Sequence, residues 1–329
     1  MTGQFAENYI SPRLKAFSVF YSNRLSFEEV ARLVERVTGA DLLSDQTIWN
    51  LATDKAQQMG TVLMQEVNDA LATETVEGVS VNPNVDLYAP DGNEILLFQD
   101  GIQVKQQKEK RSSQETGAES PSKKLPGLNT DVALLEKQSG DYEYISAPIN
   151  EKGEPLISLG TVLKVRVAQE YSHHTEPLNL VAITDGARSI AKGLKSAFGQ
   201  GLVMILDWYH LVKKLRSLMS MIAWDREQKA VHLKFIVSKL WLGKTEEVLA
   251  YLRTEINPRR EDKWKELIGY LTKHQAEIIN YNRRSRAGKV IGSGRMEKGV
   301  DLNHWPKAEE EGDELAGSRK SVPWNPQSG

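Results

Sequence analysis

The sequence has no cysteine among its 329 residues, which excludes disulfide bonds and thiolate sites for metals or nucleophilic catalysis. No apolar run approaches the roughly eighteen residues that a membrane helix needs, and the N-terminus has no signal-peptide pattern. The six histidines include no HExxH zinc motif. These absences predict a cytoplasmic globular protein without a membrane partner, which depends on carboxylate and histidine chemistry. With 40% apolar residues it can build two or three domains.

The net charge of -2 conceals a strong asymmetry along the chain. Residues 188–301 carry 23 Lys and Arg against 12 Asp and Glu, whereas residues 302–329 carry three basic and five acidic residues. A basic half can bind phosphate backbones by releasing counterions, whatever the overall average. The same charges could instead form a solvated helix face, so charge alone does not identify a polyanionic partner.

Three short apolar runs each end on an aspartate: EILLFQD at Asp100, NLVAITD at Asp185 and LVMILD at Asp207. Such runs are typical of buried strands, and residues at strand ends are where open sheets carry their chemistry. Carboxylates gathered at one sheet edge are costly unless a cation pairs with them, and Mg²⁺ suits such ligands. Taken singly, each aspartate has a simpler interpretation as a helix cap or turn residue.

Residues 26–59 predict two helices joined by a turn. The first has Ser26 as its N-cap with Glu29 completing a capping box, and Gly39 ends it. The second begins at Ser44 or Asp45, and the helical pattern continues from Thr61 to about Thr75. The pair fits a helix-turn-helix in which three side chains face a DNA groove, although any helical hairpin has a similar pattern: Gln46, Thr47 and Asn50.

The middle of the chain alternates strands with helices. A hairpin is expected across Ser139, Gly140 and Asp141, a helix over 155–173, and then two strands that end at Asp185 and Asp207, each followed by a helix. This order predicts an α/β fold with a mixed sheet flanked by helices. Residues 222–287 are almost wholly helical in pattern, which predicts an all-helical insertion. One apolar stripe within it comprises Trp264, Leu267, Ile268, Leu271 and Ile278.

Four segments in succession, EILLFQDGIQVK, LNLVAITDGARSI, VMILDWYHLVKKL and GSGRMEKGVD, carry a family resemblance. They resemble the motifs of bacterial insertion-sequence transposases with an RNase H-like DDE core, in the Mutator-like branch, over roughly residues 15–301. The resemblance implies that Asp100, Asp185 and Glu297 are the catalytic residues and ligands of two Mg²⁺ or Mn²⁺ ions. Glu297 lies 112 positions after Asp185, which leaves room for the family's helical insertion.

The resemblance also concerns the residues around this triad. The family usually has a Cys and a His three residues apart after the second Asp, and Asp207 and His210 stand there. We expect Asp207 to cap a helix, and His210 either to touch a scissile phosphate or to pack in the core. Basic residues late in the chain are expected to hold the DNA backbone: Arg283, Arg284, Arg286, Lys289, Arg295 and Lys298.

The function implied is that of a transposase that binds the terminal inverted repeats of its element and catalyses metal-dependent DNA cleavage and strand transfer. Its partners would be double-stranded DNA and further copies of the chain, in the nucleoid. The expected regions are a helical DNA-binding region (1–78), an RNase H-like core (79–221) with a flexible loop at 106–128, and the helical insertion (222–287). The end of the core with Glu297 (288–301) and a disordered tail (302–329) follow.

The acidic tail after Asp301 departs from the family, which continues as a basic helix there. Codons that encode HWPKAEEEGDEL can be chosen so that a shift of one base gives a basic run, so we interpret 302–329 as out of frame. A helix of one or two turns behind Glu297 has marginal stability, so it would hold Glu297 poorly. This copy could therefore be truncated and inactive. The alternatives are a non-catalytic DNA-binding protein derived from a transposase, and another RNase H-like nuclease that acts on hybrids or junctions.

Overall fold

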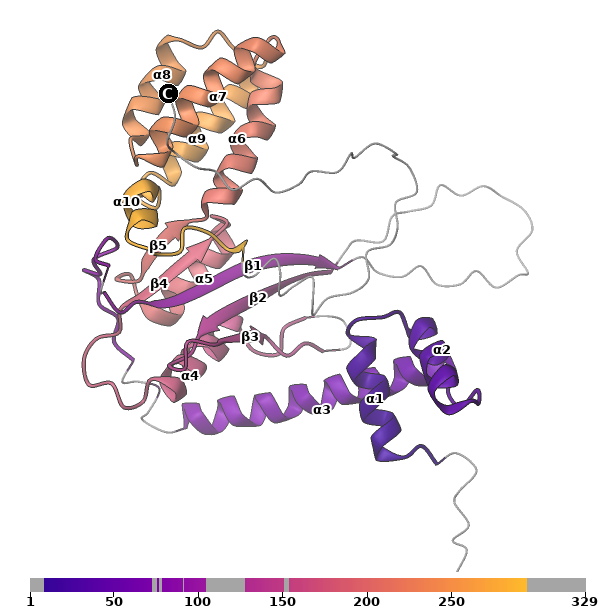
Figure 1. Ribbon diagram of the computed structural model, residues 1–329. Helices are drawn as coiled ribbons and strands as arrows, with labels where there is room; N and C mark the ends of the chain where they lie inside the picture. Colours follow the sequence, from indigo (N-terminus) through magenta and orange to yellow (C-terminus); the bar gives the residue numbers. More distant parts are fainter. Residues whose placement is uncertain are drawn as a thin grey trace, which may run out of the picture. The chain divides into compact units, whose positions relative to one another are not determined.

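The computed structural model describes residues 9–72, 76, 79–90, 92–104, 128–150 and 154–294 (Figure 1). The predictions for Arg295, Glu297 and Lys298 and for the tail at 302–329 lie outside these residues. So does the loop expected at 106–128, except that its last residue begins a strand. The chain divides into two compact units, whose described parts are residues 9–52 and residues from 53 onward.

The N-terminal unit consists of α1 (Pro12–Ser22), α2 (Phe27–Thr38) and the start of α3 (Asp45–Leu71). The predicted capping box is confirmed, since Ser26 and Glu29 satisfy each other's backbone N–H groups, and Gly39 ends α2 at a φ of 74°. The buried side chains Val30, Val34, Leu43 and Ile48 form its core. Helix α1 was not predicted.

The second predicted helix does not end near residue 59. Helix α3 continues through Gly60 for 27 residues in all, so the two helical stretches expected on either side of that glycine are one. A glycine inside a helix costs only about 1 kcal/mol relative to alanine, which packing readily offsets. The helices expected over 26–59 are therefore present, and the second continues along the helical pattern predicted from Thr61 as far as Leu71.

The second unit contains a five-stranded sheet in the order β3-β2-β1-β4-β5 (Figure 1). Strands β1 (Ile95–Val104), β2 (Leu128–Glu136) and β3 (Tyr142–Ser146) pair antiparallel, whereas β4 (Leu180–Thr184) and β5 (Val203–Leu206) continue the sheet parallel to β1. The predicted mixed sheet and the hairpin between β2 and β3 are confirmed. Strand β1 continues four residues past Asp100, which is therefore not a strand-end residue as predicted.

The two faces of the sheet follow from the alternation of side chains along its strands. Leu97 points to the face covered by α4 (Leu159–Glu170) and α5 (Arg188–Phe198). Leu96 and Phe98 belong to the opposite face, whose core includes buried residues of α6 (Trp208–Ile222). Both faces of the central strands are thus covered, which explains why every residue of β4 is buried and all but Thr184 are apolar.

The helices predicted for residues 222–287 are present as α7 (Arg226–Trp241), α8 (Thr245–Thr254), α9 (Glu261–Lys273) and α10 (Tyr281–Arg286). The predicted apolar stripe is buried at Leu267, Leu271 and Ile278 and half-buried at Trp264 and Ile268. These side chains join the α6 face of the sheet in one continuous core. No helix in the described part of the chain is long and apolar enough to cross a membrane.

Candidate active site

The sheet register brings three aspartates to one level at the carboxyl edge of its parallel strands. Asp100, Asp185 and Asp207 directly follow the last residues that pair β1 with β4 and β4 with β5. Adjacent strands lie about 4.8 Å apart, so these three positions are neighbours across the sheet. Each follows by two residues a buried side chain of the face that α6 covers: Phe98, Ile183 and Ile205.

Asp100 occupies an environment that disfavours its charge. Burial raises the pKa of its carboxyl group, His210 opposes that rise, and the charges of Asp185 and Asp207 add to it. The backbone N–H of Gly101 donates a hydrogen bond of 2.8 Å to its Oδ1 atom. A half-buried carboxylate that faces two others is where a bound cation would contribute most.

Asp207 is fully buried and caps α6, as predicted. Its Oδ1 atom accepts hydrogen bonds from the backbone N–H groups of Tyr209 (2.7 Å) and His210 (3.0 Å), and its Oδ2 atom accepts one from Ser293. Burial raises the pKa of Asp207, but hydrogen bonds from His210 and Ser293 outweigh it and leave the pKa below its usual value. Both oxygens are engaged, so Asp207 serves to hold α6 against the segment that leads toward Glu297.

His210 lies one turn into α6, with its Nδ1 atom 3.7 Å from Oδ2 of Asp207. That distance allows an ion pair but no hydrogen bond, and the buried Nδ1 atom has no hydrogen-bond partner among the described residues. Interaction with Asp207 raises the pKa of His210, burial lowers it, and the charges of Asp100 and Asp185 raise it further. The side chain is one-quarter exposed. This exposure fits a residue beside the row of Asp100, Asp185 and Asp207, here called the acidic row, better than a residue within the core.

The helical insertion closes over the turn that follows Asp185. Lys273 donates a hydrogen bond of 3.2 Å to the carbonyl oxygen of Gly186. The His274 ring packs against the same glycine, with Nδ1 2.5 Å from Oε2 of Glu277, while its buried Nε2 has no partner in the described structure. The sequence did not predict these contacts, because the helical pattern does not indicate that the end of α9 lies against residue 186.

Gly186 allows this closure because it has a φ of 85° and no side chain. A Cβ atom there would lie 2.8 Å from both Cε1 of His274 and Cδ1 of Leu206. We expect Gly186→Ala to lower the free energy of unfolding by about 2–5 kcal/mol, from left-handed strain and overpacking together. Gly140→Ala is the control, because Gly140 has a φ of 82° with nothing within 4 Å. Equal losses in urea denaturation would contradict the packing argument.

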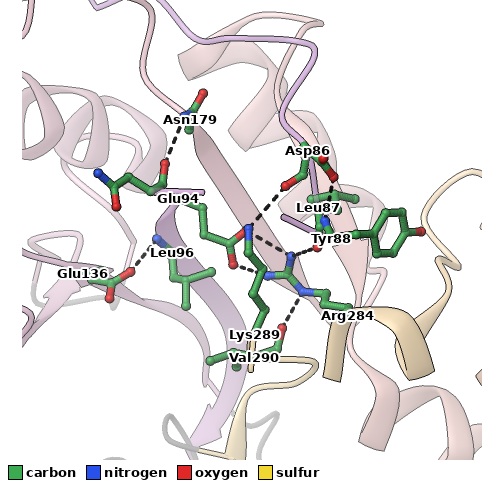
Figure 2. A network of polar contacts seen from close by, with 11 residues as sticks. Asp86, Leu87, Tyr88, Glu94, Leu96, Glu136, Asn179, Arg284, Lys289 and Val290 are labelled. Carbon is green, nitrogen blue, oxygen red and sulfur yellow. Dashed lines mark hydrogen bonds and ion pairs between the residues drawn. The ribbon is translucent and has the colours of Figure 1, made fainter. Parts of the chain in front are cut away.

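Two residues predicted to contact DNA belong instead to a buried ion network, which Figure 2 shows. Arg284 is fully buried, and its guanidinium pairs with the Glu94 carboxylate while also donating to the carbonyls of Leu87 (3.1 Å) and Val290 (2.7 Å). Lys289 reaches the same carboxylate at 3.1 Å, and only 7% of its side chain is exposed. Arg284 and Lys289 therefore hold α10 and Val290 to the chain before β1, and neither can reach a phosphate.

The other described residues predicted to contact DNA remain available. Arg283 and Arg286 are exposed on α10, and the Arg283 guanidinium lies 4.7 Å from the centre of the Tyr88 ring. In the N-terminal unit, Gln46 and Asn50 are exposed one turn apart on α3 and hydrogen-bond to each other at 3.2 Å. Thr47 between them is half-buried beside Ser44, whose hydroxyl caps the helix.

The acidic row offers the type of ligand atom that a hard cation prefers, because Asp100 and Asp185 have carboxylate oxygens. Among the described residues, however, no group of three or more His, Asp or Glu side chains is arranged to hold a metal ion. The third predicted ligand, Glu297, lies outside them. A further carboxylate was missed: Asp131 on β2 faces Gly101, and burial raises its pKa, Gln99 opposes this and Asp185 adds to it. Its position just before the apolar run VALL was a usable signal.

No protein-family model matches the chain, and no curated protein is significantly similar to it.

Proposed function

We propose that the chain is a DDE transposase that cuts and joins DNA at the ends of its element. The observation that carries the proposal is the placement of Asp100 and Asp185 at one level on adjacent parallel strands. Two further observations support it: the antiparallel strands β1, β2 and β3 are followed in the chain by β4 and β5 parallel to β1, and the helices α7 to α10 come after the second aspartate.

Each residue of the site has a proposed role that follows from its chemistry. Asp100, Asp185 and Glu297 would hold two Mg²⁺ or Mn²⁺ ions, which supply activation of the attacking oxygen and stabilisation of the leaving oxygen. Asp207 fixes the start of α6 and the backbone at Ser293. His210, with a raised pKa beside the acidic row, is placed to carry a positive charge toward a phosphate.

DNA positioning falls to the exposed residues. Arg283 and Arg286 would hold the backbone near the site, and Gln46, Thr47 and Asn50 would read the terminal repeats from α3. Joining two ends implies at least two copies of the chain on the DNA, and such a protein would reside in the cytoplasm at the nucleoid.

The test is cleavage of duplexes that carry the genomic DNA on either side of the gene. We expect binding in the presence of EDTA and cleavage only after Mg²⁺ or Mn²⁺ is added. Binding without cleavage under any metal condition would favour the non-catalytic alternative, which the acidic composition of residues 302–329 supports. Cleavage of an RNA–DNA hybrid in preference to duplex would overturn the transposase proposal in favour of another nuclease.

A further inference from the structure

Helix α6 carries an exposed stripe that leads away from the acidic row. Tyr209, Val212, Lys213 and Arg216 are spaced by three and four residues and therefore lie on one side of the helix, opposite buried residues such as Leu211 and Leu218. Together with Trp208 they line a hollow of about 440 Å³. That volume lies within the range of sites that hold small organic groups, about 300–1,000 Å³.

No acidic side chain among the described residues pairs with the two charges on this stripe. Lys213 and Arg216 are exposed, and neither forms an ion pair within the described chain, whereas the neighbouring Lys214 pairs with Glu266 at 2.7 Å. The stripe thus presents two cations that have no ion-pair partner in the described part of the chain, and Trp208 and Val212 add apolar lining to the hollow. An anion with an attached flat apolar group would satisfy both features.

Tyr209 connects the stripe to the candidate active site. The residue is 56% exposed, while its backbone N–H donates a hydrogen bond to Asp207 in the acidic row. The ring also packs against Gly292, where a Cβ atom would lie 2.5 Å from its Cδ2 atom. One side of the ring therefore contacts Gly292, and the rest of the ring surface is open to a ligand on a residue that follows closely after the N-cap Asp207.

We propose that this stripe binds the unpaired nucleotides next to the scissile phosphate, with one base stacked on Tyr209 and the following phosphates on Lys213 and Arg216. Aromatic side chains bind bases by stacking only when the base has left the duplex, so the occupant is single-stranded DNA. At 1.5 Å per residue the stripe from 209 to 216 is roughly 10 Å long, which is enough for a few nucleotides only. The proposal rests on the proposed function and specifies its substrate at the cleavage point.

The test measures binding of a fluorescein-labelled oligothymidylate of about 20 nucleotides to the full chain in EDTA, by anisotropy across a salt series. Tyr209→Ala should weaken binding by about 5- to 150-fold, and Tyr209→Phe by about twofold at most. The double variant Lys213→Gln, Arg216→Gln should reduce the slope of log K against log salt by about 1.4. The control Lys192→Gln, Lys195→Gln makes the same charge change on α5, under the other sheet face, and should leave the slope unchanged.

Unchanged binding by Tyr209→Ala and by the α6 double variant would overturn the inference, as would failure of the wild-type chain to bind the oligonucleotide. Equal weakening by the α5 control would also overturn it, because the effect would then be one of net charge. If the wild-type chain cleaves duplex DNA while the α6 variants bind normally, the proposed function survives without this surface. If the α6 variants lose binding but no form cleaves DNA, the surface stands and the transposase proposal fails.

Discussion

Replacing Asp100 or Asp185 by asparagine is expected to lower the rate of metal-dependent DNA cleavage by roughly 1,000-fold or more. Loss of one carboxylate from a two-metal site removes several kcal/mol of transition-state stabilisation, and about 1.4 kcal/mol corresponds to tenfold in rate. Glu297→Gln should behave alike. Single-turnover cleavage of an end-containing duplex in Mg²⁺ measures the loss, and binding of the same duplex in EDTA should remain within about twofold of wild type because phosphate contacts supply the affinity.

Stability separates this catalytic effect from a structural one. Because the pKa of Asp100 is raised, its charged form weakens the folded state: stability falls as pH rises from the usual value near 3.8 through the raised one. Asp100→Asn should therefore unfold at the same or a higher urea concentration than wild type at neutral pH. The pKa of Asp207 is lowered, so its charged form stabilises the folded state, and Asp207→Asn should be less stable than wild type at neutral pH. A variant at Asp100 that is both inactive and less stable would indicate a structural role instead.

The parts of the site that lie in local sequence were predictable. The parallel strands β4 and β5 were visible as apolar runs, and in a parallel sheet their carboxyl ends meet at one edge. Asp207 was predicted as a cap because a helix follows it directly, and capping is a local interaction. The end of β1 was misplaced, since GIQVK is half polar and its pairing is with β2, which begins more than twenty residues later in the chain.

What could not be predicted depends on contacts between distant segments. Arg284 looks like its exposed neighbours Arg283 and Arg286 in a basic run, and only the approach of Glu94, 190 residues earlier, distinguishes it. His274 likewise follows an ordinary helix, and its contact with Gly186 results from the way α9 returns to the sheet. Helical periodicity identifies which face of a helix is buried, whereas the partner of that face is a property of the whole chain.

Arg284→Met is expected to lower the free energy of unfolding by about 3–5 kcal/mol, because it leaves the Glu94 carboxylate buried with only Lys289 beside it. Glu94 is 8% exposed, so water cannot replace the lost guanidinium. The same change removes the hydrogen bond to Val290, so the segment that leads toward Glu297 should loosen and cleavage should fall with stability. Urea unfolding followed by circular dichroism gives the first quantity, and single-turnover cleavage gives the second.

The matched control is Arg260→Met, which breaks an ion pair with Asp262 at 2.8 Å on the surface, where both side chains are at least half exposed. Water and salt screen that pair, so its loss should change the urea midpoint little. The pairing itself is measured by a double-mutant cycle: Glu94→Gln should cost markedly less in the Arg284→Met background than in wild type, because the carboxylate has already lost its main partner. If Arg284→Met and Arg260→Met unfold at the same urea concentration, or the cycle shows no coupling, the buried network does not hold the end of the core in place.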